Sequence, residues 1–271
     1  MVHIPFDRED VIDKDVEAQI MRSIADIERE HDVRILHAAE SGSRAWGFHS
    51  PNSDYDVRFF YVRPRDWYLS IYPGRDVIEL PIDETYDVSG WDLKKTLHLA
   101  MKSNAVVMEW LQSPVVYKTD AAFTRALSEY CAHCFNPKAL MHHYLNLGKR
   151  QIDQTWRTST EAPIKKYFYM IRPAMALRWL MINGHDAIVP MNIQDLMDGA
   201  DVSPDIRNTL NDLIGQKRRM QEKAPTKRIN VLDTFIVEAF EAAEKAVAEM
   251  PNPDAPDVAR ADTFFRSWLT D

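Results

Sequence analysis

The sequence predicts an α+β protein, in which a small mixed β-sheet with flanking helices precedes a mainly helical domain. Two observations support this prediction. The strand candidates, short runs rich in β-branched and aromatic residues, lie within the first ninety residues. After Gly90, apolar residues recur at helical spacing and prolines interrupt the pattern. We therefore expect a first domain over residues 1–117 and a second over residues 118–271.

The first domain begins with an amphipathic helix, predicted over residues 7–30 from apolar residues near a 3.6-residue period. Strands are expected over residues 33–39, 56–62, 77–82 and 85–88. A Gly-Ser turn and a loop with Gly47, Pro51 and Asn52 separate the first two strands. Further helices are expected over residues 92–103, 105–112, 121–132, 137–157, 163–183, 204–223, 230–250 and 262–269.

The formal net charge of −8 argues against non-specific binding of nucleic acid by the whole surface. The charge is uneven, because residues 1–117 have a net charge of −8, residues 138–228 of +6 and residues 229–271 of −6. An acidic part beside a basic segment suits a phosphate-rich ligand. The alternative is that these are solvated surfaces that differ in charge and bind nothing.

The only two cysteines, Cys131 and Cys134, fit a reducing compartment and provide no disulfide framework. No apolar run approaches the roughly 20 residues of a membrane span, and the N-terminal segment is too acidic for a signal peptide. We expect a cytoplasmic protein with no membrane partner.

The strongest motif is Ser41-Gly42-Ser43-Arg44, and a ten-residue spacer, residues 44–53, separates Ser43 from Asp54-Tyr55-Asp56-Val57. A Gly-Ser turn lets backbone N–H groups approach an anion closely, because glycine has no Cβ. Asp54 and Asp56 are two residues apart, so on a strand both carboxylates point to one face. Hard oxygen ligands beside a phosphate cradle are what a Mg²⁺–nucleotide site requires.

The order of strand, Gly-Ser turn, spacer and Asp-x-Asp resembles the nucleotidyltransferase superfamily related to DNA polymerase β. More narrowly, the chain is similar to the RlaP/YcgL-like predicted nucleotidyltransferases. The segments that carry this similarity are SGSRAWGFHSPNSDYDVRFFYV, DVSGWDLKKTL, KSNAVVMEWLQSPVVY and KKYFYMIRPAMALRWL. They occur in the family's order, and the similarity covers most of residues 35–198. The resemblance implies a polymerase β-like palm domain followed by a helical domain that closes the active-site cleft.

The resemblance further implies a two-metal mechanism with two Mg²⁺ ions, or Mn²⁺ as an alternative, and an NTP, first of all ATP. Gly42 and Ser43 would hold its phosphates, and Asp54 and Asp56 would bind the metal. A third carboxylate is required as catalytic residue and metal ligand. Its candidates are Glu79, Asp83, Glu84, Asp87 and Asp92. We favour Asp87, which precedes the Ser-Gly-Trp of the family pattern, while Glu79 shares the same apolar-flanked environment.

Basic and aromatic residues extend the expected nucleotide site. Arg44 follows the turn and can reach a phosphate, or it forms a surface salt bridge. Lys95 matches a basic position of the family pattern. Lys165, Tyr169 and Arg172 share one helical face by their spacing and form a candidate second wall for the triphosphate. A later cluster of Lys217, Arg218, Arg219, Lys223, Lys227 and Arg228 is a candidate for RNA contacts, although such runs are usually solvated helix faces.

The expected activity is transfer of an NMP to an acceptor hydroxyl with release of pyrophosphate. The family association suggests an RNA end as acceptor. AMP transfer to a protein tyrosine or to a small molecule is the enzymatic alternative, so a protein partner stays open. A non-catalytic, nucleotide-binding regulator is the alternative of a different class.

Overall fold

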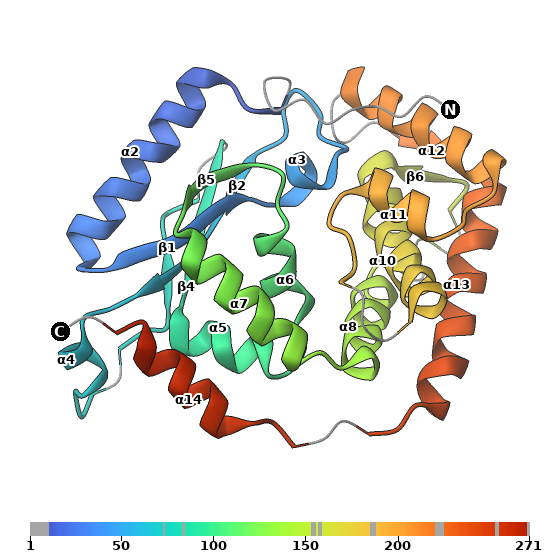
Figure 1. Cartoon of the computed structure of the whole chain (residues 1–271). Coiled ribbons are helices and arrows are strands. Elements are labelled where there is room, and N and C mark those ends of the chain that lie inside the picture. Colours follow the sequence, from blue (N-terminus) through green and yellow to red (C-terminus); the bar gives the residue numbers. More distant parts are fainter. Residues whose placement is uncertain are drawn as a thin grey trace. The chain divides into compact units, whose positions relative to one another are not determined.

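The computed structural model describes residues 11–72, 74–82, 85–152, 156, 159–184, 188–219, 225–252 and 255–269. The chain divides into two compact units, whose helices and strands are labelled in Figure 1. The sheet unit comprises Pro5–Ala45, Asp54–Phe135 and Ala255–Asp271, and the helical unit comprises Met1–Ile4, Trp46–Ser53 and Asn136–Asp254. The fold is α+β, as predicted.

The sheet unit contains a five-stranded mixed sheet in the order β3-β4-β2-β1-β5. Its strands are β1 (Arg34–Glu40), β2 (Tyr55–Val62), β3 (Val77–Glu79), β4 (Tyr86–Asp92) and β5 (Val116–Thr119). The central pair β2 and β4 is parallel, and the other neighbouring pairs are antiparallel. Parallel pairing matters for the site, because it brings the beginnings of β2 and β4 to the same edge of the sheet.

Helices cover both faces of this sheet (Figure 1). Successive residues of β2 point to opposite faces, so Val57 and Phe59 pack with α2 (Lys14–His31), while Phe60 and Val62 pack with the helices opposite. The helices of that second face are α5 (Leu93–Ala100), α6 (Ala105–Leu111), α7 (Ala121–His133) and α14 (Val258–Ser267). Two apolar cores therefore hold the central strands rigidly, as a precise site on them requires.

Two short helices interrupt the connections of the sheet unit. The helix α3 (Gly42–Trp46) occupies the position of the predicted Gly-Ser turn, and α4 (Arg65–Tyr68) follows β2. The side chain of Asp92 caps α5 by accepting a hydrogen bond from the Lys94 amide at 2.8 Å, as its position in the sequence predicted. This capping role and a 2.7 Å hydrogen bond from the Tyr68 hydroxyl occupy the Asp92 carboxylate.

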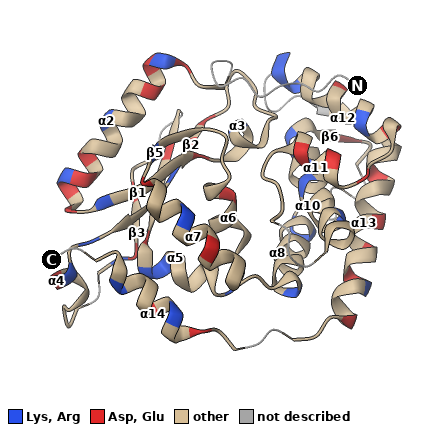
Figure 2. Ribbon diagram, in the orientation of Figure 1, with Lys and Arg blue, Asp and Glu red and all other residues tan. Residues whose placement is uncertain are grey.

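The helical unit is built on α10 (Ile164–Asn183), whose side chains are buried along most of its length. Around it lie α8 (Pro137–Lys149), α11 (Ile193–Gly199), α12 (Pro204–Arg219) and α13 (Asn230–Glu249), with a ribbon of β6 (Glu161–Pro163) and β7 (Pro225–Lys227). Helices α8 and α13 pack closely at Gly148, where a Cβ would lie 2.0 Å from the Phe240 ring. Figure 2 shows acidic residues along α13, the acidic C-terminal part of the charge pattern.

This division of the chain differs from the predicted boundary at residue 117. Helix α7 belongs to the sheet unit, because Phe123 and Leu127 are buried in the same core as Phe60 of β2. Helix α14 joins that core too, and the rings of Phe123 and Trp268 lie 5.1 Å apart. Conversely, the loop of residues 46–53 belongs to the helical unit, in which Phe48 stacks on Phe168 at 4.4 Å.

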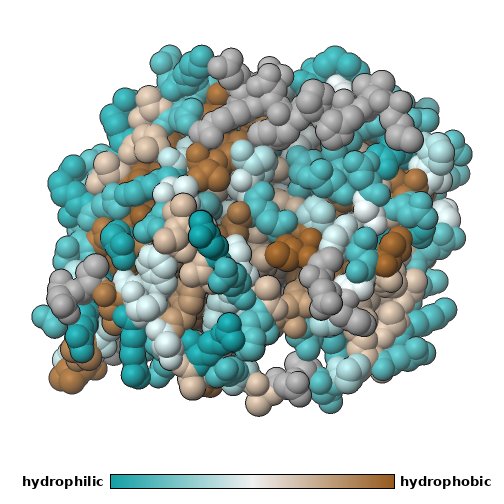
Figure 3. All heavy atoms as spheres, viewed as in Figure 1, coloured by the Kyte–Doolittle hydropathy of each residue, from teal (hydrophilic) through white to brown (hydrophobic). Residues whose placement is uncertain are grey.

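Figure 3 shows one face of the molecule, on which hydrophobic residues form small separate patches among hydrophilic ones. Within the described residues, no helix combines the length and apolar character that a bilayer crossing demands.

Candidate active site

Two predicted catalytic carboxylates, Asp56 and Asp87, are neighbours across the sheet. Asp56 is the second residue of β2 and Asp87 the second residue of β4, and the two are paired in the parallel register. Residues paired in this way project to the same face of the sheet. The two carboxylates, about 30 residues apart in the chain, therefore lie side by side at one edge of the sheet.

Arg58 joins these carboxylates. Its Nη2 donates to Asp56 Oδ1 at 3.0 Å and to Asp87 Oδ2 at 2.6 Å. Its Nη1 donates to the backbone carbonyls of Val57 at 3.1 Å and Asp87 at 2.6 Å. Arg58 lies two residues after Asp56 and so points to the same face of β2. The sequence analysis did not single out Arg58, although this two-residue spacing was visible in the sequence.

Gly42 forms the other side of the Asp56 carboxylate. Its φ of +57° lies in the left-handed region, and a Cβ added there would be 1.8 Å from Asp56 Oδ2. The amide of Ser41 donates to the Asp56 carbonyl at 2.8 Å, which fixes the chain beside β2. The Gly-Ser motif and the Asp-x-Asp motif, separated by the loop of residues 46–53, are thus in direct contact.

The hydroxyl of Ser43 is buried and has no hydrogen-bond partner among the described residues. A buried hydroxyl without a partner is uncommon in proteins and calls for an explanation, such as an absent ligand. Ser43 was predicted to contact nucleotide phosphates. Its orphaned hydroxyl, one residue after Gly42, is consistent with that role.

A buried carboxyl group, Glu40, holds the backbone of Asp56 by a hydrogen bond. Glu40 has no exposed surface and accepts hydrogen bonds from the Asp56 amide at 2.9 Å and from the Tyr117 hydroxyl at 2.6 Å. Burial raises the pKa of Glu40 to about 7, against the lowering effect of these two hydrogen bonds. Sequence analysis missed Glu40. The available signal was an acidic residue directly after the mostly apolar run of residues 33–39.

Arg44 holds the beginning of β2. Its Nε donates to the Asp54 carbonyl at 3.2 Å, its Nη1 donates to the Val11 carbonyl at 2.6 Å, and its guanidinium lies 3.7 Å from the centre of the Tyr55 ring. The side chain is 5% exposed, so these contacts are internal. Arg44 is therefore buried and not a surface residue, and its phosphate contact stays a prediction.

The other predicted carboxylates are Asp54 and the alternative candidates for the third carboxylate. Asp54 directly precedes β2, and its carboxylate has no hydrogen-bond or ion-pair partner in the described part of the chain. Glu79 is paired with Arg75 at 2.8 Å and lies in register with Ser89, not with Asp87. Asp83 and Glu84 lie outside the described residues. Of the described candidates for the third carboxylate, Asp87 is the one in register with Asp56.

Lys95 forms an ion pair with Asp76, whose Oδ1 lies 3.3 Å from Lys95 Nζ. This pair lies near the opposite ends of β3 and β4 from Asp87, because Asp76 precedes β3 and Lys95 belongs to α5 after β4. The predicted nucleotide contact of Lys95 thus gains no support from the described contacts.

In the helical unit, two of the three predicted residues of α10, Tyr169 and Arg172, contact the Trp46 ring, and the third, Lys165, lies over Tyr169. Lys165 Nζ lies 5.9 Å from the Tyr169 ring centre, Tyr169 meets Trp46 edge-on at 6.0 Å, and the Arg172 guanidinium lies 4.7 Å from the Trp46 ring. Arg172 is 3% exposed and donates to the Met191 carbonyl at 3.3 Å. The expected shared face is present, and Arg172 lies at its buried end.

The later basic cluster is only partly a surface feature. Lys217 is 1% exposed, with its Nζ 4.9 Å from the Phe48 ring centre. Arg228 stacks on Trp156 at 3.9 Å and is paired with Asp233 at 2.9 Å. Lys223 lies outside the described residues. These contacts assign Lys217 and Arg228 to the packing of the helical unit.

The carboxylates fit a divalent cation by their chemistry. Asp56 and Asp87 already converge on one cation, Nη2 of Arg58, and carboxylate oxygens are the ligands that Mg²⁺ prefers. Among the described residues, no three ligating side chains form a preformed metal cage.

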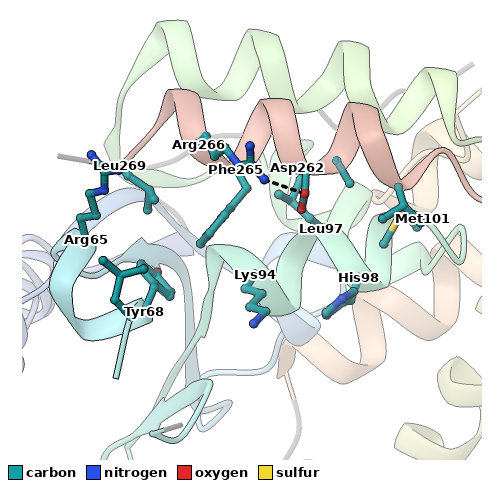
Figure 4. A pocket seen from close by; sticks show the side chains of 13 residues that line it. Arg65, Tyr68, Lys94, Leu97, His98, Met101, Asp262, Phe265, Arg266 and Leu269 are labelled. Carbon is teal, nitrogen blue, oxygen red and sulfur yellow. Dashed lines mark hydrogen bonds and ion pairs between the residues drawn. The ribbon is translucent and has the colours of Figure 1, made fainter. Parts of the chain in front are cut away.

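A cavity of about 580 Å³ lies elsewhere in the sheet unit, among residues of α4, α5 and α14 (Figure 4). Its lining includes Tyr68, Lys94, His98 and Phe265, and the Arg266–Asp262 ion pair of 3.0 Å lies at its rim. None of the described residues that line it is a predicted site residue.

The mixed five-stranded sheet with helices on both faces is consistent with a polymerase β-like domain, and the family comparison places the chain in such a family. The chain belongs to the RlaP family, described as an RNA repair pathway DNA polymerase beta family, which matches residues 16–267. It is also 40% identical over 232 residues to the uncharacterized protein YcgL of Bacillus subtilis (strain 168), covering 86% of this chain and 88% of that protein. The family description indicates nucleotidyl transfer in RNA repair.

Proposed function

We propose that this chain is a Mg²⁺-dependent nucleotidyltransferase that moves an NMP from an NTP, with ATP as first candidate, to a hydroxyl at an RNA end. Pyrophosphate is the leaving group. The observation that carries the proposal is the pairing of Asp56 with Asp87 beside Gly42. The RNA acceptor rests on the family description and on the net charge of +6 over residues 138–228.

Each residue of the sheet unit has a separate task in this proposal. Asp54, Asp56 and Asp87 would hold the two divalent cations, which when bound would supply charge neutralisation at the phosphates and lower the pKa of the attacking hydroxyl. The Ser43 hydroxyl donates to a phosphate oxygen and gains the partner that it lacks among the described residues. Glu40 holds the backbone amide of Asp56 and Gly42 lies against its carboxylate, so little rearrangement is needed when substrate binds.

In the helical unit, Lys165 is the proposed contact to the triphosphate, and Tyr169 and Trp46 are the aromatic surfaces beside it. A half-buried lysine over the Tyr169 ring, which itself contacts Trp46, combines a positive charge with a surface on which a base can stack. Arg172 keeps the Trp46 ring in place by covering it. This assignment follows the expectation from the spacing of α10.

The test incubates the protein with Mg²⁺ and each of the four α-³²P-labelled NTPs in turn. The acceptors are a mixture of RNAs with free 3′-hydroxyl ends and, separately, total cellular protein. We expect label on RNA, and its loss in the Asp54→Asn/Asp56→Asn double variant, which removes charge with little change of shape. A variant at an exposed carboxylate, Glu79→Gln, is the matched control and should keep the activity.

The other outcomes each contradict part of the proposal. Label on protein would replace the RNA acceptor by a protein one, such as a tyrosine hydroxyl. Labelling that persists in the double variant would remove the carboxylates from the mechanism. No label from a folded protein would contradict the RNA activity and favour a small-molecule acceptor or a nucleotide-binding regulator.

A further inference from the structure

The guanidinium of Arg58 occupies the position between the two paired carboxylates. We propose that Arg58 is a resident cation of this site, which holds Asp56 and Asp87 together and weakens their binding of a divalent metal ion. This inference rests on the proposed cation site and deepens it. Arg58 is a positioning residue here, because it acts on the substrate only through the carboxylates.

The charges of the site show why a resident cation is useful. Asp54, Asp56 and Asp87 together carry three negative charges at neutral pH, and Asp56 and Asp87 are partly buried, with side chains 18% and 29% exposed. Carboxylates in such a place repel each other strongly unless a cation lies between them. Arg58, itself 16% exposed, supplies one fixed positive charge at every physiological pH.

The anchoring of Arg58 distinguishes it from an ordinary ion pair. Its Nη1 is bound by the backbone carbonyls of Val57 and Asp87, and only Nη2 contacts the carboxylates. Backbone atoms of β2 and β4 are fixed by the sheet. The guanidinium is therefore anchored independently of the carboxylate oxygens that a metal ion would require.

The consequence for metal binding follows from this arrangement. One oxygen of Asp56 and one of Asp87 are already engaged with a cation, while the Asp54 carboxylate has no partner within the described residues. An incoming Mg²⁺ or Mn²⁺ meets a net charge of −2 from these four side chains rather than −3. Binding without nucleotide should therefore be weak, and the triphosphate supplies the negative charge that completes the site.

The experiment measures Mn²⁺ binding to the full chain without nucleotide, by electron paramagnetic resonance of free Mn²⁺. In Arg58→Gln we expect affinity to rise at least about tenfold, because one positive charge is removed a few ångströms from the ligands. Arg58→Lys keeps the charge but cannot reach two carboxylates and two carbonyls together, so we expect a rise of about threefold. Loss of structure would instead lower the affinity.

Arg75→Gln is the matched control, because it removes one arginine charge from an exposed pair with Glu79. Its Mn²⁺ affinity should equal that of the wild type. Unchanged or weaker binding in both Arg58 variants would overturn the role of Arg58 while leaving the cation site intact. If Arg58→Gln does not fold, the Mn²⁺ affinity of Arg58→Lys alone tests the role of Arg58. Absence of Mn²⁺ binding in all proteins would overturn the cation site, and this inference with it.

Discussion

The backbone of Gly42 lies directly against the carboxylate of Asp56. A Cβ at Gly42 would be 1.8 Å from Asp56 Oδ2, and the φ of +57° is one that L side chains rarely adopt. Two motifs that are separate in the sequence therefore form one structure. Because the contact leaves no space for a methyl group, the position of the Asp56 carboxylate depends on the absence of a side chain at residue 42.

Gly42→Ala should therefore lower the rate of transfer by at least about 100-fold, because the methyl group displaces the Asp56 carboxylate from its position. We also expect a loss of about 1–3 kcal/mol in the free energy of unfolding from the left-handed backbone. Gly184→Ala is the matched control, since Gly184 has a φ of +76° with no atom within 4 Å of an added Cβ. It should lose stability but keep its activity. Equal activity in the two variants would contradict a role for the Gly42–Asp56 contact.

Asp87→Asn should lower the rate of transfer by about 10²- to 10⁴-fold, because the third carboxylate holds the cation and assists removal of the hydroxyl proton. Glu79→Gln should change the rate by less than about twofold, because its carboxylate is exposed and paired with Arg75. Initial rates at saturating NTP measure both effects. A large loss in Glu79→Gln with full activity in Asp87→Asn would reverse the assignment.

The buried Glu40 should make the stability of the protein fall as pH rises. The pKa of Glu40 is about 7 in the folded protein and 4.5 in the unfolded reference, so the folded state binds more protons between these values. The contribution of Glu40 to the free energy of unfolding is fully present below about pH 4.5. It is lost as pH rises through 7, by roughly 3 kcal/mol in total. Urea unfolding at several pH values measures how the free energy of unfolding changes with pH.

In Glu40→Gln, the part of the pH dependence of the free energy of unfolding that comes from Glu40 should disappear, because glutamine does not ionise. Its side chain is of similar size and can still accept a hydrogen bond from the Asp56 amide. Glu79→Gln, at an exposed position, should keep the wild-type pH dependence. If Glu40→Gln also keeps that pH dependence, Glu40 does not titrate in this range.

Lys165 and Arg172 should respond differently to the loss of their charge. Arg172→Met removes a buried guanidinium that covers Trp46 and donates to Met191, so we expect a loss of about 1–3 kcal/mol in the free energy of unfolding. Lys165→Met should leave stability near the wild-type value and weaken NTP binding by about tenfold. Urea unfolding and equilibrium NTP binding separate the two. Wild-type NTP affinity in Lys165→Met would remove Lys165 from the nucleotide site.

Local patterns predicted much of the fold. The strands observed as β1 and β2 and most of the helices were predicted within a few residues, because their apolar spacing and proline boundaries are local signals. The strand β5 was missed. It has four residues, and its pairing partner β1 lies about 80 residues away in the sequence. The residues around β5 therefore carry no local pattern that predicts a strand.

The domain boundary was harder to predict for the same reason. Helix α7 has the apolar pattern of any amphipathic helix, and only its burial beside Phe60 shows that it covers the sheet. Likewise, the turn residues of the loop 46–53 predicted an ordinary connection. The aromatic rings of Trp46 and Phe48 instead bury this loop in the helical unit.

At the candidate site, the acidic pair Asp54 and Asp56 was recognisable from its spacing. The choice of Asp87 over Glu79 needed the family resemblance, because both are flanked by apolar residues. The register of β2 with β4 separates them in the structure. Arg58 and Glu40 were missed. Their places in the sequence were visible, two residues after Asp56 and directly before the Gly-Ser motif, but their roles depend on partners that only the folded structure brings together.

The most direct test of nucleotidyl transfer compares ATP labelled with ³²P at the α-phosphate and at the γ-phosphate, with Mg²⁺ and RNA. We expect the α-label to enter RNA, the γ-label to leave as pyrophosphate, and both events to disappear in Asp56→Asn. Transfer of the γ-label to RNA, or release of inorganic phosphate without transfer, would contradict nucleotidyl transfer by these carboxylates.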